Sequence, residues 1–160
     1  MAIYSKTMNS PIGILKLTSD EYHLKSVSFD AEIMEDAPEL PEVLDNTQKQ
    51  LEEYFLGSRR QFDLPLDPGG TAFQQTIWKQ LSEVTYSSTK SYIEIARAVG
   101  SGSSSRAVGM ANGRNPIPVI IPCHRIIGHD GKLTGYSGGL ERKKWLLLHE
   151  QKNQENGKLF

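Results

Sequence analysis

Three prolines within seven residues strongly restrict the backbone of one short segment, Asn115–Arg125. A proline fixes its own φ and biases the preceding residue toward extended geometry. The sequence therefore predicts a stiff, extended strut built on Pro116, Pro118 and Pro122. Near its end the strut carries Cys123, the only cysteine of the chain.

Cys123 is open to two interpretations. A lone cysteine after an apolar run such as Val119–Ile121 is usually a small buried core residue. The pair His124-Arg125 follows directly and favours a reactive thiol, because a neighbouring imidazole can lower the thiol pKa or accept its proton. Adjacent side chains of an extended chain point to opposite sides, so a bridging water could carry the proton between Cys123 and His124.

Length and cysteine content limit the classes of protein to which the chain can belong. Its 160 residues suit one mid-sized domain or two small ones. A single cysteine excludes an internal disulfide and any zinc site with two thiolates, and we expect no metal and no cofactor. We expect a cytoplasmic protein, because a reactive free thiol needs a reducing compartment and the sequence has neither a signal-peptide pattern nor a membrane-spanning apolar run.

The two halves of the chain carry opposite charge. Residues 1–72 hold 6 basic and 13 acidic side chains, a net charge of −7, whereas residues 73–160 hold 12 basic and 6 acidic ones, a net charge of +6. This division suggests that only the second half meets a polyanion. Chance segregation of surface charge is the simpler alternative.

Patterns in the first half predict a small sheet and one helix. Apolar residues at strand-like spacing occupy residues 3–29, and an acidic loop follows. A helix is expected from near Pro41 to Gly57, with Leu44, Leu51 and Phe55 on one face. The polar, proline- and glycine-containing stretch 58–71 marks a boundary. We therefore expect an N-terminal α/β domain with linker at 1–70 and a second domain at 71–160.

The second half predicts several helices. Phe73, Ile77 and Leu81 form an apolar stripe on a helix over 73–81 that we expect to face the core. Two short helices, 92–99 and 103–112, flank the Gly100-Ser-Gly102 turn as in a helix-turn-helix motif. The second of these helices has small residues on one face and a single charge, a composition that suits either the DNA minor groove or close helix packing inside the protein. Both alternatives remain open for Ala107, Gly109 and Ala111.

The last part of the chain predicts a turn and a final helix. Asp130-Gly131 between apolar pairs indicates a small hairpin or wing. A glycine-rich loop follows at 135–139, which by itself is a weak signal for a pocket. We expect the helix to span 140–150 with Trp145 and Leu148 toward the core, together with Leu146 or Leu147. We expect the polar tail from Gln151 to fray.

Taken together, these motifs resemble the O6-alkylguanine-DNA alkyltransferases, also called methylated-DNA–protein-cysteine methyltransferases. Ile121-Pro-Cys-His-Arg-Ile126 matches the active-site signature residue by residue. Motifs at the family's spacing also occur over residues 73–150: Phe73-Gln74, Ile77-Trp78, Leu81, Tyr92, Arg106–Gly109, Asn115-Pro116, Tyr136–Leu140, Trp145-Leu146 and His149-Glu150. Several motifs in one order are far more specific than any single short pattern.

The resemblance implies a fold, an activity and a partner. It implies an α+β protein with a small ribonuclease H-like N-terminal sheet domain and a mostly helical C-terminal domain with a winged helix-turn-helix. The implied activity is single-turnover DNA repair, in which an alkyl group moves irreversibly from O6-alkylguanine, with O4-alkylthymine as a second possible substrate, to Cys123. The implied partner is double-stranded DNA bound through the minor groove with the nucleotide flipped out, by a monomer that could bind cooperatively.

The resemblance also implies residue roles. Cys123, His124 and Glu150 match a thiol–water–imidazole–carboxylate chain, Tyr92 matches the residue that rotates the nucleotide and reaches the base, and Asn115 matches a hinge. Arg106 matches the residue that fills the gap left in the duplex. The remaining expected contacts are Ser101, Ala107, Gly109 and Arg114 to DNA, and Pro118, Tyr136, Ser137 and Lys143 around the substrate.

Two departures and two alternatives accompany this interpretation. Some relatives hold zinc through N-terminal cysteines that this chain lacks, and the wing residues 128–131 differ, which leaves their DNA contacts open. The first alternative is a lesion-binding protein without transfer, against which Cys123 argues because such relatives replace the cysteine. The second is a Cys-His hydrolase, which gives no reason for Arg106 or the small-residue helix.

Overall fold

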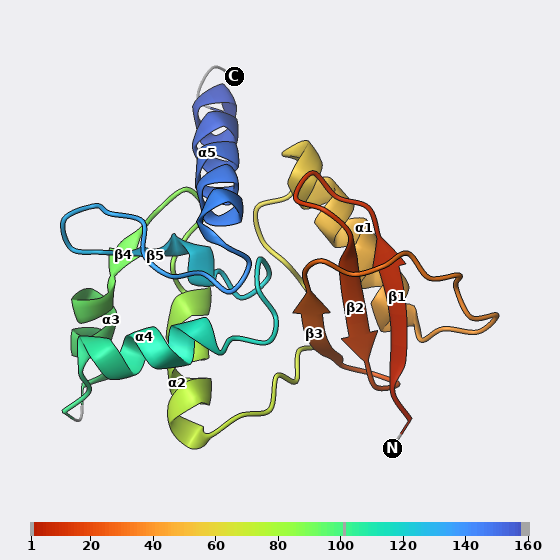
Figure 1. Ribbon diagram of the computed structural model, residues 1–160, viewed down its shortest axis with the longest axis horizontal. Helices are drawn as coiled ribbons and strands as arrows, with labels where there is room; N and C mark the ends of the chain where they lie inside the picture. Colours follow the sequence, from red (N-terminus) through yellow and green to blue (C-terminus); the bar gives the residue numbers. More distant parts are fainter. Residues whose placement is uncertain (1, 101, 158–160) are drawn as a thin grey trace. The chain divides into compact units, whose positions relative to one another are not determined.

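The chain divides after Gly69 into two units, Met1–Gly69 and Gly70–Phe160. The computed structural model describes residues 2–100 and 102–157. The expected α+β class is confirmed, since a small sheet forms in the first unit and helices dominate the second (Figure 1). Within these described residues, no helix is both long and apolar enough to cross a lipid bilayer.

The first unit pairs an antiparallel sheet with one helix (Figure 1). Strands β1 (Tyr4–Met8), β2 (Leu15–Ser19) and β3 (Leu24–Ser28) lie in the order β1-β2-β3. Helix α1 (Glu42–Leu56) follows Pro41 and ends at Gly57, whose φ of 87° provides the left-handed C-cap. Buried side chains from both elements form the core: Leu15, Leu17, Leu24, Val27, Leu44, Leu51 and Tyr54. Phe55 was expected on this face but is only half-buried, and Tyr54 takes its place.

Helices α2 (Ala72–Ser82), α3 (Tyr92–Val99) and α4 (Ser105–Gly113) form the helical cluster of the second unit. Each begins at a capping hydroxyl: Thr71 and Ser91 form capping boxes, and Ser104 accepts from the backbone N–H of Ala107. The Trp78 indole N–H donates to the carbonyl of Ala111 at 2.8 Å, which fixes α4 against α2. The expected helix-turn-helix of α3 and α4 is confirmed.

The stripe predicted on α2 is only partly buried. Ile77 and Leu81 are fully buried, but Phe73 in the first turn is 37% exposed. Phe73 lines a surface hollow with Val99 and Ala107, so periodicity alone overestimated the buried face.

The end of the chain also differs from the prediction. Helix α5 (Leu140–Gly157) continues past Glu150, and residues 158–160 lie outside the described part. Leu148 is 53% exposed, whereas Lys143, Leu146 and Glu150 are fully buried. The buried face of α5 is therefore partly charged. Of the residues expected in the core, Leu146 is buried, Trp145 is half-buried and Leu148 is exposed.

A tight turn forms at Gly128–Lys132, closed by a hydrogen bond from the Gly128 N–H to the Lys132 carbonyl at 2.9 Å. The predicted hairpin does not form around it. Strand β5 (Ile126–Ile127) pairs instead in parallel with β4 (Lys90–Ser91), far away in sequence. This pairing places the segment after Cys123 beside the start of α3.

Candidate active site

The proline-rich segment before Cys123 is a series of tight turns, so the extended strut was wrong. The Ile121 N–H donates to the Ile117 carbonyl at 2.9 Å, and Val119 between them has a φ of 73°, an uncommon value for a β-branched residue. Pro122 (φ −81°, ψ 64°) forms an inverse γ-turn in which the Cys123 N–H donates to the Ile121 carbonyl at 2.7 Å. Proline restricts φ but leaves ψ open to turns, which is why the extended prediction failed.

Asn115 holds these turns together with its side-chain amide. Its Oδ1 accepts from the Ile117 N–H at 3.0 Å, and its Nδ2 donates to the Ile121 carbonyl at 2.8 Å. The amide also hydrogen-bonds to the Cys123 thiol. Asn115 thus fixes the path of the chain between α4 and the thiol.

After Pro122 a short 3₁₀ helix, η1 (Cys123–Arg125), turns two side chains toward Glu150 of α5. His124 Nε2 lies 2.6 Å from Glu150 Oε2, and Arg125 donates from Nε to Oε1 at 2.9 Å and from Nη2 to Oε2 at 3.1 Å. The Ser87 N–H adds a bond to Oε1 at 3.0 Å. The expected histidine–carboxylate pair therefore forms, with both side chains fully buried.

Arg125 is a member of this cluster that sequence reasoning missed. Besides its two bonds to Glu150, it donates from Nη1 to the Val84 carbonyl at 2.7 Å and lies over the ring of Tyr86. The signal was present, since Arg125 follows His124 directly, but its partner is 25 residues away in sequence. Only the fold could show that both residues use the same carboxylate.

The charge state of the His124–Glu150 pair follows from burial and hydrogen bonding. Burial would raise the pKa of Glu150, but hydrogen bonds and charge from His124 and Arg125 outweigh it and hold the pKa well below its usual value. Burial lowers the pKa of His124, while the hydrogen bond to Glu150 opposes that shift. The pair is therefore a neutral imidazole on an ionised carboxylate at neutral pH.

This charge state assigns the tautomer of His124. An ionised carboxylate only accepts hydrogen bonds, so Nε2 carries the proton and Nδ1 is an acceptor. Nδ1 is buried and has no hydrogen-bond partner among the residues that the structure describes. His124 thus presents an unused basic nitrogen within the site.

The thiol of Cys123 is protonated at rest. Burial raises its pKa to about 11, although the Asn115 hydrogen bond and the charge of Lys143 act in the opposite direction. Cys123 is 2% exposed. A buried thiol of this kind needs a base at the moment of reaction, and a neutral imidazole is suited to that role.

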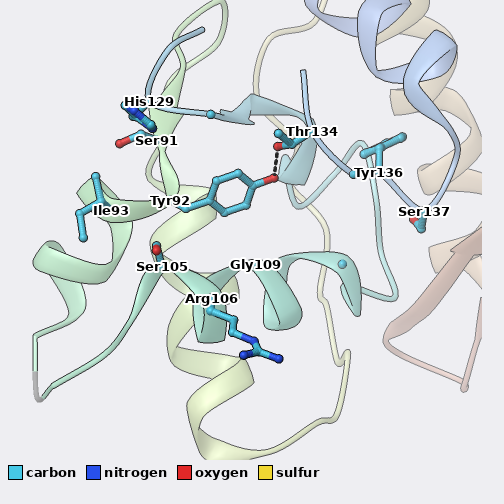
Figure 2. Close-up of a pocket in the computed structure, with 13 residues that line it drawn as sticks. Ser91, Tyr92, Ile93, Ser105, Arg106, Gly109, His129, Thr134, Tyr136 and Ser137 are labelled. Atoms are coloured by element: carbon cyan, nitrogen blue, oxygen red, sulfur yellow. Dashed lines mark hydrogen bonds between the residues drawn. The ribbon is translucent and has the colours of Figure 1, made fainter. Parts of the chain in front are cut away.

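A pocket of about 610 Å³ lies between α3, α4 and the loop at 128–137. Tyr92, Arg106, Gly109, Tyr136 and Ser137 line it, so the structure brings these five predicted site residues together (Figure 2). Thr134, which sequence reasoning did not single out, also lines it and lies 2.7 Å from the Tyr92 hydroxyl oxygen.

The Cys123 thiol is buried and does not line this pocket. Among the described residues, neither Cys123 nor Pro118 belongs to the lining, and both are buried. Burial raises the pKa of Tyr136, and the charge of Cys123 raises it further. Tyr136 also lines the pocket.

Lys143 does not line the pocket but binds the backbone of a residue that does, Thr134. Its Nζ donates to the carbonyls of Ile126 at 2.5 Å and Thr134 at 2.9 Å. Burial lowers the pKa of Lys143 to about 8.

The residues expected to contact DNA lie on or beside α4. Arg106 and Arg114 are exposed, and Ala107 is half-buried. In Figure 2 the Arg106 side chain points away from the Tyr92 ring. A Cβ at Gly109 would lie 3.7 Å from the Tyr92 ring, an ordinary van der Waals contact, so this packing does not by itself require a glycine. Ser101 lies outside the described residues.

Comparisons with known proteins identify the family. Residues 3–68 match the model described as "6-O-methylguanine DNA methyltransferase, ribonuclease-like domain", and residues 72–152 match the corresponding "DNA binding domain". Methylated-DNA–protein-cysteine methyltransferase of Methanosarcina acetivorans is 45% identical over 92% of this chain and 98% of its own, and that of Mycobacterium tuberculosis is 44% identical over 93% of each.

A solved structure extends the similarity to the fold. The crystal structure of Mycobacterium tuberculosis OGT in complex with DNA is 43% identical, covers 94% of each chain and gives a TM-score of 0.85. Similarity at this level spans both units of the chain and includes the DNA-binding part. The chain therefore belongs to the 6-O-methylguanine DNA methyltransferase family.

Proposed function

We propose that this protein repairs O6-alkylguanine in double-stranded DNA by moving the alkyl group onto Cys123, once per molecule. The observation that carries the proposal is the buried His124–Glu150 pair next to Cys123 in sequence, in the same unit as a pocket lined by residues of a helix-turn-helix. Family membership independently supports DNA binding and methyl transfer to a cysteine.

The reaction begins with deprotonation of the thiol. A water bridges Cys123 Sγ to His124 Nδ1 and passes the proton to the imidazole. The carboxylate of Glu150 then stabilises the resulting imidazolium, as the acidic member of a catalytic triad does. Arg125 holds the carboxylate in place through its two hydrogen bonds.

Alkyl transfer follows as a displacement at carbon. The sulfur forms a bond to the alkyl carbon, the bond from that carbon to guanine O6 breaks, and its electron pair remains on the guanine. Tyr92 supplies a proton to a ring nitrogen, so that neutral guanine leaves, and main-chain N–H groups near Ser137 stabilise charge on O6. The product is a thioether, and the sequence has no second thiol to reverse it.

The DNA-binding surface is α4 and its surroundings. Its small residues allow close approach to the minor groove, Arg106 enters the space that the flipped nucleotide leaves, and Arg114 contacts a phosphate. Ala107 and Gly109 complete this surface, and Ser101 is a further proposed DNA contact. Pro118 and Lys143 shape the substrate site. Asn115 couples α4 to the thiol. We infer that the monomer acts in the cytoplasm without a metal or cofactor.

The test is to mix the protein with duplex DNA that contains a single O6-methylguanine and to measure the mass of the Cys123 peptide. A gain of one CH₂, stoichiometric with protein and absent with unmodified duplex, is expected. Cys123→Ser should bind the duplex and gain no mass. Tight binding without any gain by the wild-type protein would identify a lesion-binding protein instead, and transfer by Cys123→Ser would exclude Cys123 as the nucleophile.

A further inference from the structure

The hydroxyl of Thr134 makes a polar contact inside the pocket that the mechanism above does not use. Its Oγ1 lies 2.7 Å from the hydroxyl oxygen of Tyr92, a distance typical of a good O–H···O bond. The two residues are 42 positions apart, and Figure 2 shows the Tyr92 ring extending from the start of α3 toward Thr134. Both side chains line the pocket.

Contacts on the other sides of Thr134 restrict its movement. Its carbonyl accepts from Lys143 Nζ at 2.9 Å, and Lys143 also binds the Ile126 carbonyl. Its Cγ2 methyl lies 3.7 Å from the position that a Cβ on Gly128 would take, so the methyl faces the turn at 128–132. The hydroxyl is therefore directed to Tyr92 by a backbone fixed on α5 and a methyl placed against the turn.

Helix α4 borders the Tyr92 ring on its other side. An added Cβ on Gly109 of α4 would lie 3.7 Å from two ring carbons, in ordinary van der Waals contact. Within the 2.7 Å contact with Thr134, the hydroxyl hydrogen of Tyr92 can still rotate about the C–O bond. The direction of that hydrogen decides whether it can reach a base in the pocket.

A phenol has one hydrogen, and it can donate to one strong acceptor at a time. If Tyr92 donates to Thr134, the hydrogen is not available for a base. If Thr134 donates to Tyr92, the phenol oxygen is satisfied as an acceptor and its hydrogen points into the pocket. Hydroxyl rotation alone converts one arrangement into the other.

We propose that Thr134 is a positioning residue for alkyl transfer, whose hydroxyl donates to Tyr92 once a flipped base is bound and directs the phenolic hydrogen to that base. The inference rests on the proposed function. During the reaction the proton moves from Tyr92 to a ring nitrogen of the leaving guanine, and the Thr134 hydrogen bond stabilises the negative charge that develops on the phenol oxygen. No other atom is exchanged at Thr134.

The experiment compares single-turnover rates of transfer from O6-methylguanine in duplex DNA for wild type, Thr134→Val, Thr134→Ser, Tyr92→Phe and the double variant Tyr92→Phe/Thr134→Val. Valine keeps a methyl against the turn but lacks the hydroxyl, and serine keeps the hydroxyl. Loss of one hydrogen bond should slow Thr134→Val by about 3- to 10-fold. Thr134→Ser should stay within about twofold of wild type.

The double variant separates positioning from a purely structural role. If Thr134 acts through the Tyr92 hydroxyl, adding Thr134→Val to Tyr92→Phe should change the rate by less than about twofold. An equal slowing in both backgrounds, or no slowing in either, would overturn the inference. The mass of the wild-type Cys123 peptide is recorded in the same reactions. Failure of wild type to gain the alkyl group would reject the proposed function itself, and only its success makes the variant rates informative.

Discussion

Burial of Cys123 disfavours the thiolate form, whereas alkyl transfer requires it. With a thiol pKa near 11, hardly any thiolate exists at neutral pH, so the resting protein is protected from oxidation and from unrelated electrophiles. Reactivity then depends on a base that is present before the substrate arrives. Burial lowers the pKa of His124, which keeps the imidazole unprotonated and ready to accept the proton.

The first prediction concerns the pH dependence of transfer. Protonation of His124 removes the base, and its pKa lies below the usual 6.5. The single-turnover rate should therefore be constant as pH falls from about 8 through 6.5 and decline only at lower pH, where an ordinary histidine would already be charged. Circular dichroism over the same range checks that the fold persists. An inflection at or above 6.5 in folded protein would contradict the assigned base.

The second prediction concerns the shared carboxylate. Glu150→Gln leaves the guanidinium of Arg125 buried without its counter-charge, and the free energy of unfolding should fall by about 3–5 kcal/mol. The matched control is Glu53→Gln, which breaks the more exposed Arg59–Glu53 pair and should cost at most about 1 kcal/mol. Urea unfolding measures both changes, and equal losses would show that Glu150 is no more than a surface carboxylate.

The same variant should alter the response of stability to acid. The pKa of Glu150 is lowered in the folded protein, so its contribution to stability is complete above the usual 4.5 and is lost as pH falls below that value. In Glu150→Gln this part of the acid-induced loss should disappear. An unchanged slope of unfolding free energy against pH below 4.5 would contradict the assigned ionisation of Glu150.

At the scale of elements, the orientation of α4 depends on its N-terminal cap. Ser104 accepts from the Ala107 N–H, so Ser104→Ala should lower the free energy of unfolding by about 1 kcal/mol. Ser103→Ala is the matched control, because the hydroxyl of Ser103 precedes the N-cap residue Ser104 and does not cap the helix. The midpoint temperature of thermal unfolding and the affinity for undamaged duplex DNA should both be lower in Ser104→Ala, and neither should change in Ser103→Ala. Equal effects of the two substitutions would show that the cap does not set the helix.

Helices that are marked by sequence patterns within their own residues could be predicted from the sequence. Caps and apolar periodicity located α1 to α4 within a few residues, because each signal lies inside the helix it describes. The segment before Cys123 was not predictable, since Asn115 and the Ile117 and Ile121 backbone set its turns through bonds that proline content does not report. Thr134 was missed because its partner Tyr92 is distant in sequence.

Sequence motifs predicted which residues form the candidate site better than they predicted how those residues are arranged. The pairing of His124 with Glu150 could be expected from resemblance alone, whereas the role of Arg125 and the buried charged face of α5 required the fold. Charged residues such as Lys143 are rarely predicted to be buried, because desolvation is costly unless fixed carbonyls compensate. Two such carbonyls, of Ile126 and Thr134, are supplied by the segment after η1.

At the scale of the whole molecule, the charge division coincides with the two units. Met1–Gly69 carries a net charge of −7 and Gly70–Phe160 one of +6. A polyanion should therefore be attracted to the second unit and repelled by the first, which would favour an orientation of the protein before any specific contact forms. Cations on the two units should then contribute unequally to DNA affinity.

The final prediction tests this unequal contribution of the two units through the salt dependence of DNA affinity. Each phosphate that a protein cation neutralises adds about 0.9 to the slope of log affinity against log salt for duplex DNA. Arg114→Gln, beside α4, should reduce the slope by about one. Lys49→Gln, an exposed cation on α1 of the acidic unit, is the control and should leave the slope unchanged. Both variants lose one positive charge, so net charge cannot explain a difference between them. Equal reductions of the slope in both variants would mean that DNA affinity depends on the total charge of the protein and not on the charge of the second unit.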